Sequence, residues 1–531
     1  MAFDTADLIL TKGKVITMDS RDSIAEAVAV RDGRIVYVGS SEEIARMAGE
    51  ETQVIDLRGK TMIPGFGDAH AHLDMYGMMT SDLTADCRIP PLGSVDEILQ
   101  SIRDRSACLA KGELVIGQAR PFQEYPTKEQ LDQAAPDHPV IVKASMHWYL
   151  LNSRALEKFK ITRGLPILED LLAIDSCAFI QRNEATNEPT GYLEECWNYL
   201  FPRSVSPFTY EETKRCIRES LQKASKYGLT SATELLCHPE STRIYQDLHN
   251  NGDLKVRLQL VPCFYGSYRT VELDEVIRCG LTTGFGNDWI KFGGLKTFLD
   301  SHQLKLSYTQ AQLDDWFGKA HRNGLRMFMH AITKDAQEMG LRSIEKEASS
   351  TGLESIRAMR HRMEHMGNED LDPTFFQRVK NLGAIALPTA YFMNMGPGTL
   401  ASPRTKKSFM FKTLLDMGLC AAGSSDTAGA VPEALNPMYE IWCMVNRKSL
   451  DGNLVSPSEK ISVLEALRVY TIHSAYAARE EEIKGSIETG KLADFVVLDK
   501  DPFTIDEDEL KDVAVAMTIV DGKIVYKRNE P

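Results

Sequence analysis

The sequence predicts an α/β fold: a TIM-type (β/α)8 barrel with a small β-sandwich domain built from both chain ends and a large insertion after the first barrel strand. Three observations lead to this prediction. Strand-like apolar runs alternate with amphipathic helical stretches through the middle of the chain, short strand patterns occur at both ends, and a very long segment separates the first two strands of the alternating region.

The two ends of the chain carry the same hairpin signal. Near the start, "AVAVRDGRIVYVG" places Asp32-Gly33 between two alternating apolar runs, and near the end "AMTIVDGKIVYK" places Asp521-Gly522 in the same setting. An Asp-Gly pair between such runs is a strong signal for a two-residue β-hairpin. We therefore expect residues 1–60 and 485–531 to form one small β-sandwich domain, with residues 61–484 inserted into it as the barrel.

The alternating middle of the chain offers the barrel strands. In "TYEETKRCIRESLQKASKYGLTSATEL" a helix is expected to end near Gly228 and a strand to follow it, as in a parallel βα repeat. The expected strands are IPGFGDAHAH, GLTSATEL, VRLQLVP, WIKFGGLKTFLD, LRMFMHAI, MRHRMEHM, GAIALPTA and GLCAAGSSDTAG. Between the first two lie residues 80–225, far more than an ordinary connection needs, which predicts an inserted subdomain.

Polar side chains gather at the ends of these strands. The stretch "IPGFGDAHAHLDMYG" ends in His70 and His72, which point the same way because side chains on a strand alternate between faces. Lys296 lies in the fourth strand, and His330, His365 and Asp426 end the fifth, sixth and eighth strands. The carboxyl ends of barrel strands form the active-site face, so this ordered set predicts a divalent metal site, most simply with one or two zinc ions.

Composition limits the partners of the protein. The formal net charge of −14 argues against nucleic acid or an anionic membrane, and no apolar run is long enough to span a bilayer. The first residues lack the basic start and apolar stretch of a signal peptide, and the ten cysteines contain no C-x-x-C pair. We expect a cytoplasmic protein that acts on a small molecule, and the sequence leaves open whether it forms a homo-oligomer.

At these residues the chain resembles the amidohydrolase superfamily, in particular its YtcJ-like and N-substituted formamide deformylase-like metal-dependent hydrolases. The resemblance extends to the C-terminal segment "KGSIETGKLADFVVLD". It implies that His70 and His72 bind one metal and that His330 and His365 bind a second. It further implies that Asp426 binds the first metal and transfers protons, and that Lys296 is carboxylated to bridge both. A metal pair of this kind lowers the pKa of water to about 7 and polarises a carbonyl group.

The sequence also allows two alternatives to Lys296 as a carboxylated bridging residue. Lys296 can instead pair with Asp300, and Lys291 on the same segment is the alternative bridging residue. A neutral lysine that captures carbon dioxide becomes an anionic carbamate, whereas a protonated lysine would repel the metals. The resemblance weakens at the end of "KTFLD", because the family usually continues with Asp-Gly, whereas this chain has Asp300-Ser301-His302.

Residues outside the metal set are nominated as substrate contacts. "HPVIVKASMHWYLLNSRALE" resembles the segment in which a family histidine lies over the site, and it nominates His147 and Asn152, although Asn152 is better explained as a helix N-cap. Trp148 is nominated separately, as an aromatic residue that could line an apolar pocket. Further nominated contacts are His302 and, after the seventh strand, Tyr391.

Some polar residues near these segments are interpreted as structural. Strand alternation is taken to point Arg362 and Glu364 away from the neighbours of His365, and Glu195 in "EPTGYLEE" is interpreted as solvated.

We therefore expect a metal-dependent hydrolase that cleaves a carbon–nitrogen amide-type bond in a small, largely apolar, N-substituted substrate. A metal-dependent deaminase is disfavoured, because "MHAITKDA" offers no glutamate shortly after His330, although Asp335 is near. A lactone or ester hydrolase remains an alternative. A non-catalytic barrel scaffold is less favoured, because none of the expected ligand positions is missing.

Overall fold

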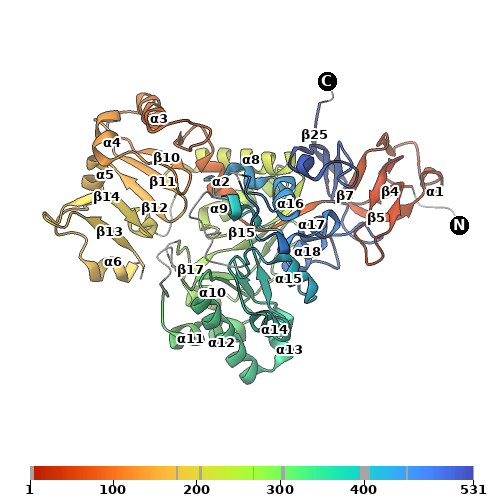
Figure 1. The fold of residues 1–531 in the computed structure, drawn as a ribbon. Coiled ribbons are helices and arrows are strands. Elements are labelled where there is room, and N and C mark those ends of the chain that lie inside the picture. Colours follow the sequence, from red (N-terminus) through yellow and green to blue (C-terminus); the bar gives the residue numbers. More distant parts are fainter. Residues whose placement is uncertain are drawn as a thin grey trace.

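The computed structural model describes residues 5–174, 177–202, 206–266, 268–300, 305–394, 407–449 and 452–529. Figure 1 shows three parts arranged along the molecule. A central α/β body lies between a mixed sheet with its helices at one end and a set of strands from both chain termini at the other end. The chain is thus α/β, as the sequence predicts.

The central body is built on parallel strands. Two sheets contain them, in the orders β18-β16-β15-β8 and β17-β19-β20-β21-β22, and every strand pair in them is parallel. Their bounds are β8 (Phe66–Ala71), β15 (Leu229–Leu235), β16 (Arg257–Val261), β17 (Cys263–Tyr265), β18 (Ile290–Phe292), β19 (Leu295–Phe298), β20 (Met327–His330), β21 (Arg362–Glu364) and β22 (Ile385–Leu387).

The predicted fourth strand is divided into β18 and β19 by Gly293-Gly294. Gly294 has a φ of 137°, and a Cβ atom there would lie 2.2 Å from the carbonyl oxygen of Arg326. Only glycine tolerates this close approach of two backbones. The kink separates the two sheets and leaves Lys296 on β19, the part of the strand nearer the carboxyl end.

The predicted eighth strand is not a regular strand among the described residues, and in this respect the prediction is wrong. The segment 419–426 nevertheless lies beside β8: the Ala69 N–H donates to the Gly423 carbonyl and the Asp426 N–H donates to the His70 carbonyl, both at 2.7 Å. These bonds join the end of the strand series back to its beginning. The segment therefore occupies the position of an eighth barrel strand.

Helices connect the parallel strands and cover their outer side. In α8, the N-cap Thr209 and Glu212 form a capping box, acidic residues begin the helix and lysines end it, as the helix dipole favours. The helix ends at Lys226, before Gly228, as predicted. The covering helices are α8 (Tyr210–Lys226), α9 (Pro239–Asn250), α10 (Leu273–Arg278), α11 (Gln310–Arg322), α12 (Lys334–Thr351), α13 (Leu353–Met359), α14 (Pro373–Leu382), α15 (Phe411–Asp416), α16 (Pro437–Asn446), α17 (Val463–Tyr470) and α18 (Ile472–Ala478).

A mixed sheet follows the first barrel strand and its helix α2 (Leu73–Met79). Its order is β13-β14-β12-β11-β10-β9. The bounds are β9 (Ala85–Asp86), β10 (Val115–Ala119), β11 (Val140–Ala144), β12 (Trp148–Leu151), β13 (Phe179–Arg182) and β14 (Pro189–Glu194), with helices α3 (Val95–Ala107), α4 (Lys128–Ala134), α5 (Ser153–Lys158), α6 (Leu168–Ile174) and α7 (Trp197–Leu200).

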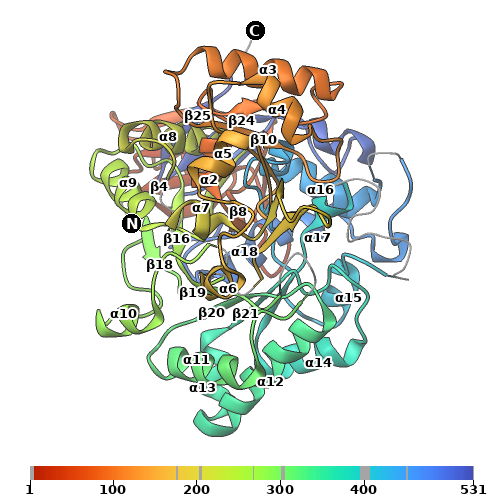
Figure 2. The ribbon, with the colours of Figure 1, turned by 90° about the vertical axis from the view of Figure 1, so that its left-hand side faces the viewer.

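This insertion lies across the barrel. Figure 2 shows it in front of the parallel strands. Tyr149 and Trp197 of the insertion share one hydrophobic cluster with Leu235 and Phe298 at the carboxyl ends of barrel strands. The insertion therefore packs on the active-site face that a parallel barrel presents. The exact limits 80–225 stay a prediction.

Strands from both chain ends form two further sheets, in the orders β5-β4-β1-β6 and β25-β24-β23-β7-β2-β3. Leu8 and Val28 of the first sheet share a core with Met62 and Phe495 of the second. The strands are β1 (Leu8–Thr11), β2 (Lys14–Ile16), β3 (Ile24–Ala25), β4 (Ala27–Arg31), β5 (Arg34–Gly39), β6 (Gln53–Asp56), β7 (Thr61–Pro64), β23 (Phe495–Leu498), β24 (Val515–Val520) and β25 (Lys523–Lys527), with helix α1 (Ser41–Ala45).

Both predicted hairpins are confirmed. Asp32-Gly33 joins β4 to β5 and Asp521-Gly522 joins β24 to β25, and all four turn residues have positive φ, as a type I′ turn requires. The domain boundaries themselves, at residues 60 and 485, stay a prediction.

A buried ion pair fastens the terminal strands to the barrel. Arg257 on β16 donates from Nε and Nη2 to the carboxylate of Asp494 at 2.8 and 3.0 Å, and Nη2 also lies 3.2 Å from Asp521. Arg257 and Asp494 are both buried. Loss of either partner would leave an uncompensated charge away from water.

We predict that Arg257→Ala lowers the free energy of unfolding by about 3–5 kcal/mol, because the carboxylate of Asp494 then stays buried without its partner. Urea denaturation followed by circular dichroism measures this. The matched control is Arg34→Ala, which removes an exposed pair with Asp288 at the same junction and should cost at most about 1 kcal/mol. Equal losses in both variants would contradict this assignment.

Candidate metal centre

Two histidines at the end of the first barrel strand meet the carboxylate of Asp426. The Nε2 atoms of His70 and His72 lie 3.2 and 3.1 Å from Oδ1 of Asp426. Each of the three residues offers one ligand atom, and these atoms lie within 4.8 Å of one another. The i, i+2 spacing thus brings both imidazoles to one point, as the sequence predicts.

The other ring nitrogen of each histidine is already engaged. Nδ1 of His70 lies 2.6 Å from Oε2 of Glu364, and Nδ1 of His72 lies 2.8 Å from the carbonyl oxygen of Leu235. A carboxylate and a carbonyl can only accept, so both Nδ1 atoms carry the proton and donate. In the neutral form of each ring the lone pair is therefore on Nε2, on the side of Asp426, which is the tautomer that a metal ligand needs.

Glu364 corrects a sequence interpretation. It is fully buried, holds His70 and accepts from Nε and Nη2 of Arg362 at 2.7 and 2.8 Å, so it does not point away from the site. Burial alone would raise the pKa of Glu364, but Arg362 and His70 hold it well below its ordinary value. The interpretation was wrong because Arg362 and Glu364 face the barrel interior, where the first strand also presents His70.

His365 reaches the site by leaving the strand alternation. Its φ is 68°, in the left-handed region that non-glycine residues rarely adopt. Its Nε2 lies 3.7 Å from Oδ2 of Asp426, and its ring centroid lies 5.1 Å from that of His70 and 4.6 Å from that of His330. Asp426 also has a left-handed φ, 41°. Such strain at two adjoining polar residues is typical of functional sites.

Burial keeps His330 and His365 uncharged. It lowers the pKa of His365 to about 3, and it holds the pKa of His330 well below its ordinary value. Asp426 behaves in the opposite way: burial alone would raise its pKa, but the neighbouring His70 and His72 hold it well below the usual range. The site therefore combines the neutral imidazoles of His330 and His365 with the ionised carboxylate of Asp426, which are the protonation states of metal ligands.

Lys296 projects into this region from β19. It is 1% exposed, and among the described residues its Nζ has no hydrogen-bond partner. Burial lowers its pKa. It is not paired with Asp300, which accepts instead from the backbone N–H groups of Ile332 and Thr333. The alternative residue Lys291 is bound to Glu480 at 2.6 Å and takes no part in the cluster.

The nominated substrate contacts have different surroundings. The ring centroid of His147 lies 6.3 Å from that of His330. The Tyr391 hydroxyl lies 3.4 Å from the carbonyl oxygen of Asp426. Trp148 belongs to the core of the insertion and packs edge-on against Phe122 with ring centroids 5.2 Å apart, and its role as a substrate contact stays a prediction. His302 lies outside the described residues.

Two further interpretations can be compared with the structure. Asn152 is the N-cap of α5, as expected, since its side chain accepts from the Ala155 N–H. Glu195 is not solvated: it is buried and lies 2.8 Å from Nδ1 of His147.

Sequence reasoning also missed Asp300 as a site residue, although it was considered as a partner of Lys296. Its Oδ1 lies 3.6 Å from Nε2 of His330, and burial raises its pKa to about 6. Its position at the end of the fourth strand was the available signal.

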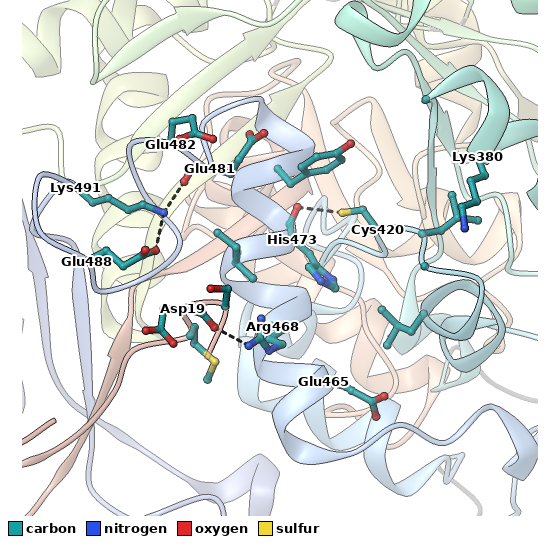
Figure 3. Close-up of a pocket in the computed structure, with 18 of the residues that line it drawn as sticks. Asp19, Lys380, Cys420, Glu465, Arg468, His473, Glu481, Glu482, Glu488 and Lys491 are labelled. Atoms are coloured by element: carbon teal, nitrogen blue, oxygen red, sulfur yellow. Dashed lines mark hydrogen bonds and ion pairs between the residues drawn. The ribbon is translucent and has the colours of Figure 1, made fainter. Parts of the chain in front are cut away.

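A cavity of about 920 Å³ lies near the amino-terminal ends of β22 and the 419–426 segment, away from this cluster (Figure 3). Several of its charged side chains bind one another or the backbone. Lys491 contacts Glu488 at 3.1 Å and the Glu481 carbonyl, and Arg468 donates to the Asp19 carbonyl. The metal ligands are not among its lining residues.

Comparison with known proteins accounts for the cluster. The sequence pattern described as "Amidohydrolase family" matches residues 53–526, which is most of the chain. The chain belongs to the amidohydrolase family. It is 30% identical to the putative amidohydrolase YtcJ of Bacillus subtilis over 97% of this chain and 99% of that protein. It is 27% identical to N-substituted formamide deformylase of Arthrobacter pascens over 98% of both chains.

The fold of this amidohydrolase occurs in solved structures. An uncharacterized metal-dependent hydrolase from Pyrococcus horikoshii matches 94% of this chain and 99% of its own with a TM-score of 0.72 at 21% identity. As a member of this family, the protein is a hydrolase that acts on carbon–nitrogen bonds. Among its described residues, no helix has the length and apolar character that a membrane crossing requires.

We predict that Glu364→Gln weakens metal binding by roughly 10- to 100-fold, because Nδ1 of His70 loses the carboxylate that orients the ring and makes Nε2 more basic. Isothermal titration of zinc into the apoprotein measures the affinity. Glu347→Gln is the control, since Glu347 is also buried and paired, but with Arg322 and away from the cluster. Unchanged zinc affinity in Glu364→Gln would refute the orienting role.

Proposed function

We propose that this amidohydrolase cleaves an amide-type bond in a small, largely apolar, N-substituted substrate. One observation carries the proposal: imidazoles, an ionised carboxylate and a buried lysine, whose amine has no hydrogen-bond partner among the described residues, converge at the carboxyl ends of the barrel strands. A divalent ion bound there supplies Lewis acidity, which acidifies water and polarises a carbonyl group.

The donor set fits a pair of divalent ions. His70, His72 and Asp426 would hold the first ion, and His330 and His365 would hold the second. Imidazole nitrogen with carboxylate oxygen is a ligand set that zinc accepts, so zinc is the metal we propose. Lys296 would bridge the two as a carbamate. Carbamate formation needs an uncharged amine, and burial of Lys296 favours that form.

Asp426 is the residue we assign to proton transfer. Because His70 and His72 keep its carboxylate ionised, it can accept a proton from the attacking water. It can then return that proton to the leaving nitrogen, which cannot depart as an anion. The strained backbone of Asp426 keeps the carboxylate next to both histidines during these steps.

The surroundings favour an apolar substituent on the substrate. Phe392 stacks on His365 with ring centroids 5.6 Å apart, and Phe298 lies 4.9 Å from the ring of His330. Ring deamination is less favoured, since Asp335, the only acidic residue in "MHAITKDA", is exposed on the first turn of α12. The deformylase named among the relatives is consistent with an N-substituted amide.

We predict that His70→Ala or His72→Ala lowers activity by about 10³-fold or more, since Lewis acidity contributes several kcal/mol to such reactions. Metal analysis by inductively coupled plasma mass spectrometry should show less than the wild-type content, with an unchanged circular dichroism spectrum. His249→Ala, outside the cluster, should retain metal and activity. Full activity in either ligand variant would contradict the site assignment.

We predict that Lys296→Ala loses activity and that a short carboxylic acid restores a fraction of it by supplying bridging oxygens. In the wild-type protein, ¹³C-labelled bicarbonate should give a carbamate signal in the NMR spectrum that Lys296→Ala lacks. Lys291→Ala should keep both signal and activity. A fully active Lys296→Ala variant, or the same carbamate signal in it, would exclude this lysine as the bridge.

A substrate panel tests the reaction class. It contains N-aryl amides, N-alkyl formamides, acylated amino acids, lactones and aminopurines, assayed with the zinc-loaded protein. We expect turnover of the N-substituted amides or formamides. Turnover confined to aminopurines would replace the proposal with deamination, and turnover of lactones alone would move the protein to the ester class.

A further inference from the structure

Two arginines leave the same edge of the insertion sheet. Arg88 comes two residues after β9 and Arg120 comes directly after β10, and these two strands are parallel neighbours. Gln123 ties the two strand ends together, because its side-chain oxygen accepts from the N–H groups of Ile89 and Arg120 at 2.9 and 2.8 Å. Both arginines are buried, with 8% and 9% of their surface exposed. This edge of the sheet therefore presents two guanidinium groups from adjacent strand ends.

The first arginine binds the loop of residues 427–433, which continues directly from Asp426. Nη1 of Arg88 donates to the Gly429 carbonyl at 3.0 Å. Nε and Nη2 of Arg88 each lie 2.8 Å from a carboxylate oxygen of Asp86, on β9. The bidentate contact fixes the plane of the guanidinium group and leaves Nη1 directed at the loop.

The second arginine binds the same loop farther along. Nη2 of Arg120 donates to both carboxylate oxygens of Glu433, at 2.8 and 2.9 Å, and Nε donates to the Pro90 carbonyl at 2.8 Å. Between these contacts the loop packs closely on α2: a Cβ atom at Gly429 would lie 2.6 Å from Cβ of Met79. The insertion and α2 thus fix the path of the loop.

Asp426, which precedes this loop, has a backbone that needs restraint. Its φ of 41° lies in the left-handed region, and such a conformation persists only where the surrounding structure over-determines it. On the amino-terminal side, the Asp426 N–H donates to the His70 carbonyl at 2.7 Å. On the carboxyl-terminal side, the two arginines hold the loop that begins at the next residue. The barrel therefore restrains Asp426 from one side and the insertion restrains it from the other.

We propose that Arg88 and Arg120 are positioning residues, which keep the Asp426 carboxylate in place by fixing the loop that follows it. This inference rests on the proposed function, because it needs Asp426 as a metal ligand and proton carrier. It gives the insertion a part in assembling the metal centre. It also gives a role to the contact between the insertion and the segment in the position of the eighth barrel strand.

Arg88→Met and Arg120→Met test the proposal, since methionine keeps an apolar side chain and removes the donors. In both variants, amide hydrogen exchange of residues 427–433 should become faster. Zinc affinity from isothermal titration should fall by about 10-fold or more, as expected when a metal ligand loses the groups that orient it. On the panel substrate that the wild-type protein turns over fastest, kcat should fall with little change in KM, because the loss concerns proton transfer rather than substrate binding.

Two further variants separate positioning from general stability. Arg120→Lys keeps a cation that can pair with the Glu433 carboxylate, so it should retain most of the zinc affinity. The matched control is Arg182→Met. Arg182 also holds a loop of the insertion, since it donates to the Thr162 and Leu165 carbonyls at 2.6 and 3.1 Å. This control should leave zinc affinity and kcat at wild-type values.

Glu433→Ala keeps the test decisive if an arginine variant does not fold, because 51% of the Glu433 side chain is exposed. It should weaken zinc affinity by up to about 5-fold, the range that a partly exposed ion pair allows. Combined with Arg120→Met, it should add no further loss, because the two residues form one contact.

Failure of the proposed function would appear in the wild-type protein, as absence of zinc binding or of turnover across the whole panel. Failure of the positioning role would appear in the variants. Wild-type zinc affinity and kcat in Arg88→Met, or multiplicative losses for Arg120→Met and Glu433→Ala, would overturn the inference. Losses of the same size in Arg182→Met would also overturn it, since they would reflect the stability of the insertion alone.

Discussion

The hydrogen bond from the Asp426 N–H to the His70 carbonyl joins the last barrel segment to the first strand, and the metal cluster depends on it. It places the Asp426 carboxylate opposite the Nε2 atoms of His70 and His72. A second bond, from the Ser425 N–H to Oδ1 of Asp68, holds the same segment. The contacts that close the ring of strands therefore also assemble the cluster. They require an unfavourable left-handed backbone conformation at Asp426.

Around this junction, hydrogen bonds set the direction of each imidazole. Glu364 and the Leu235 carbonyl accept from the Nδ1 atoms of His70 and His72, and Glu195 does the same for His147. Among the described residues the amine of Lys296 has no hydrogen-bond partner, and burial favours its neutral form. The result is a set of ring nitrogens whose directions are fixed by hydrogen bonds.

Local patterns were sufficient to predict much of this structure. The Asp-Gly hairpins and the end of α8 depend on neighbouring residues only, and the H-x-H pair depends only on strand alternation. Two features could not be predicted from neighbouring residues: the irregular backbone of the eighth strand and the division of the fourth strand at Gly293-Gly294. At these places, backbone segments that are distant in the sequence approach each other. Glu364 was misjudged, because strand alternation does not show which face of a strand is interior, nor that the left-handed backbone of His365 reverses the alternation.

The features that the sequence did not predict depend on contacts between distant segments. Glu195 is an example, because its burial follows from packing of the insertion on the barrel.

We infer that the carboxyl ends of the barrel strands converge on bound metal. An anomalous difference map recorded at the zinc absorption edge, from crystals of the zinc-loaded protein, tests it most directly. We expect one peak beside Nε2 of His70 and His72 and Oδ1 of Asp426, and a second beside His330 and His365. Peaks elsewhere, with His70 and His72 bound only to Asp426, would contradict the account.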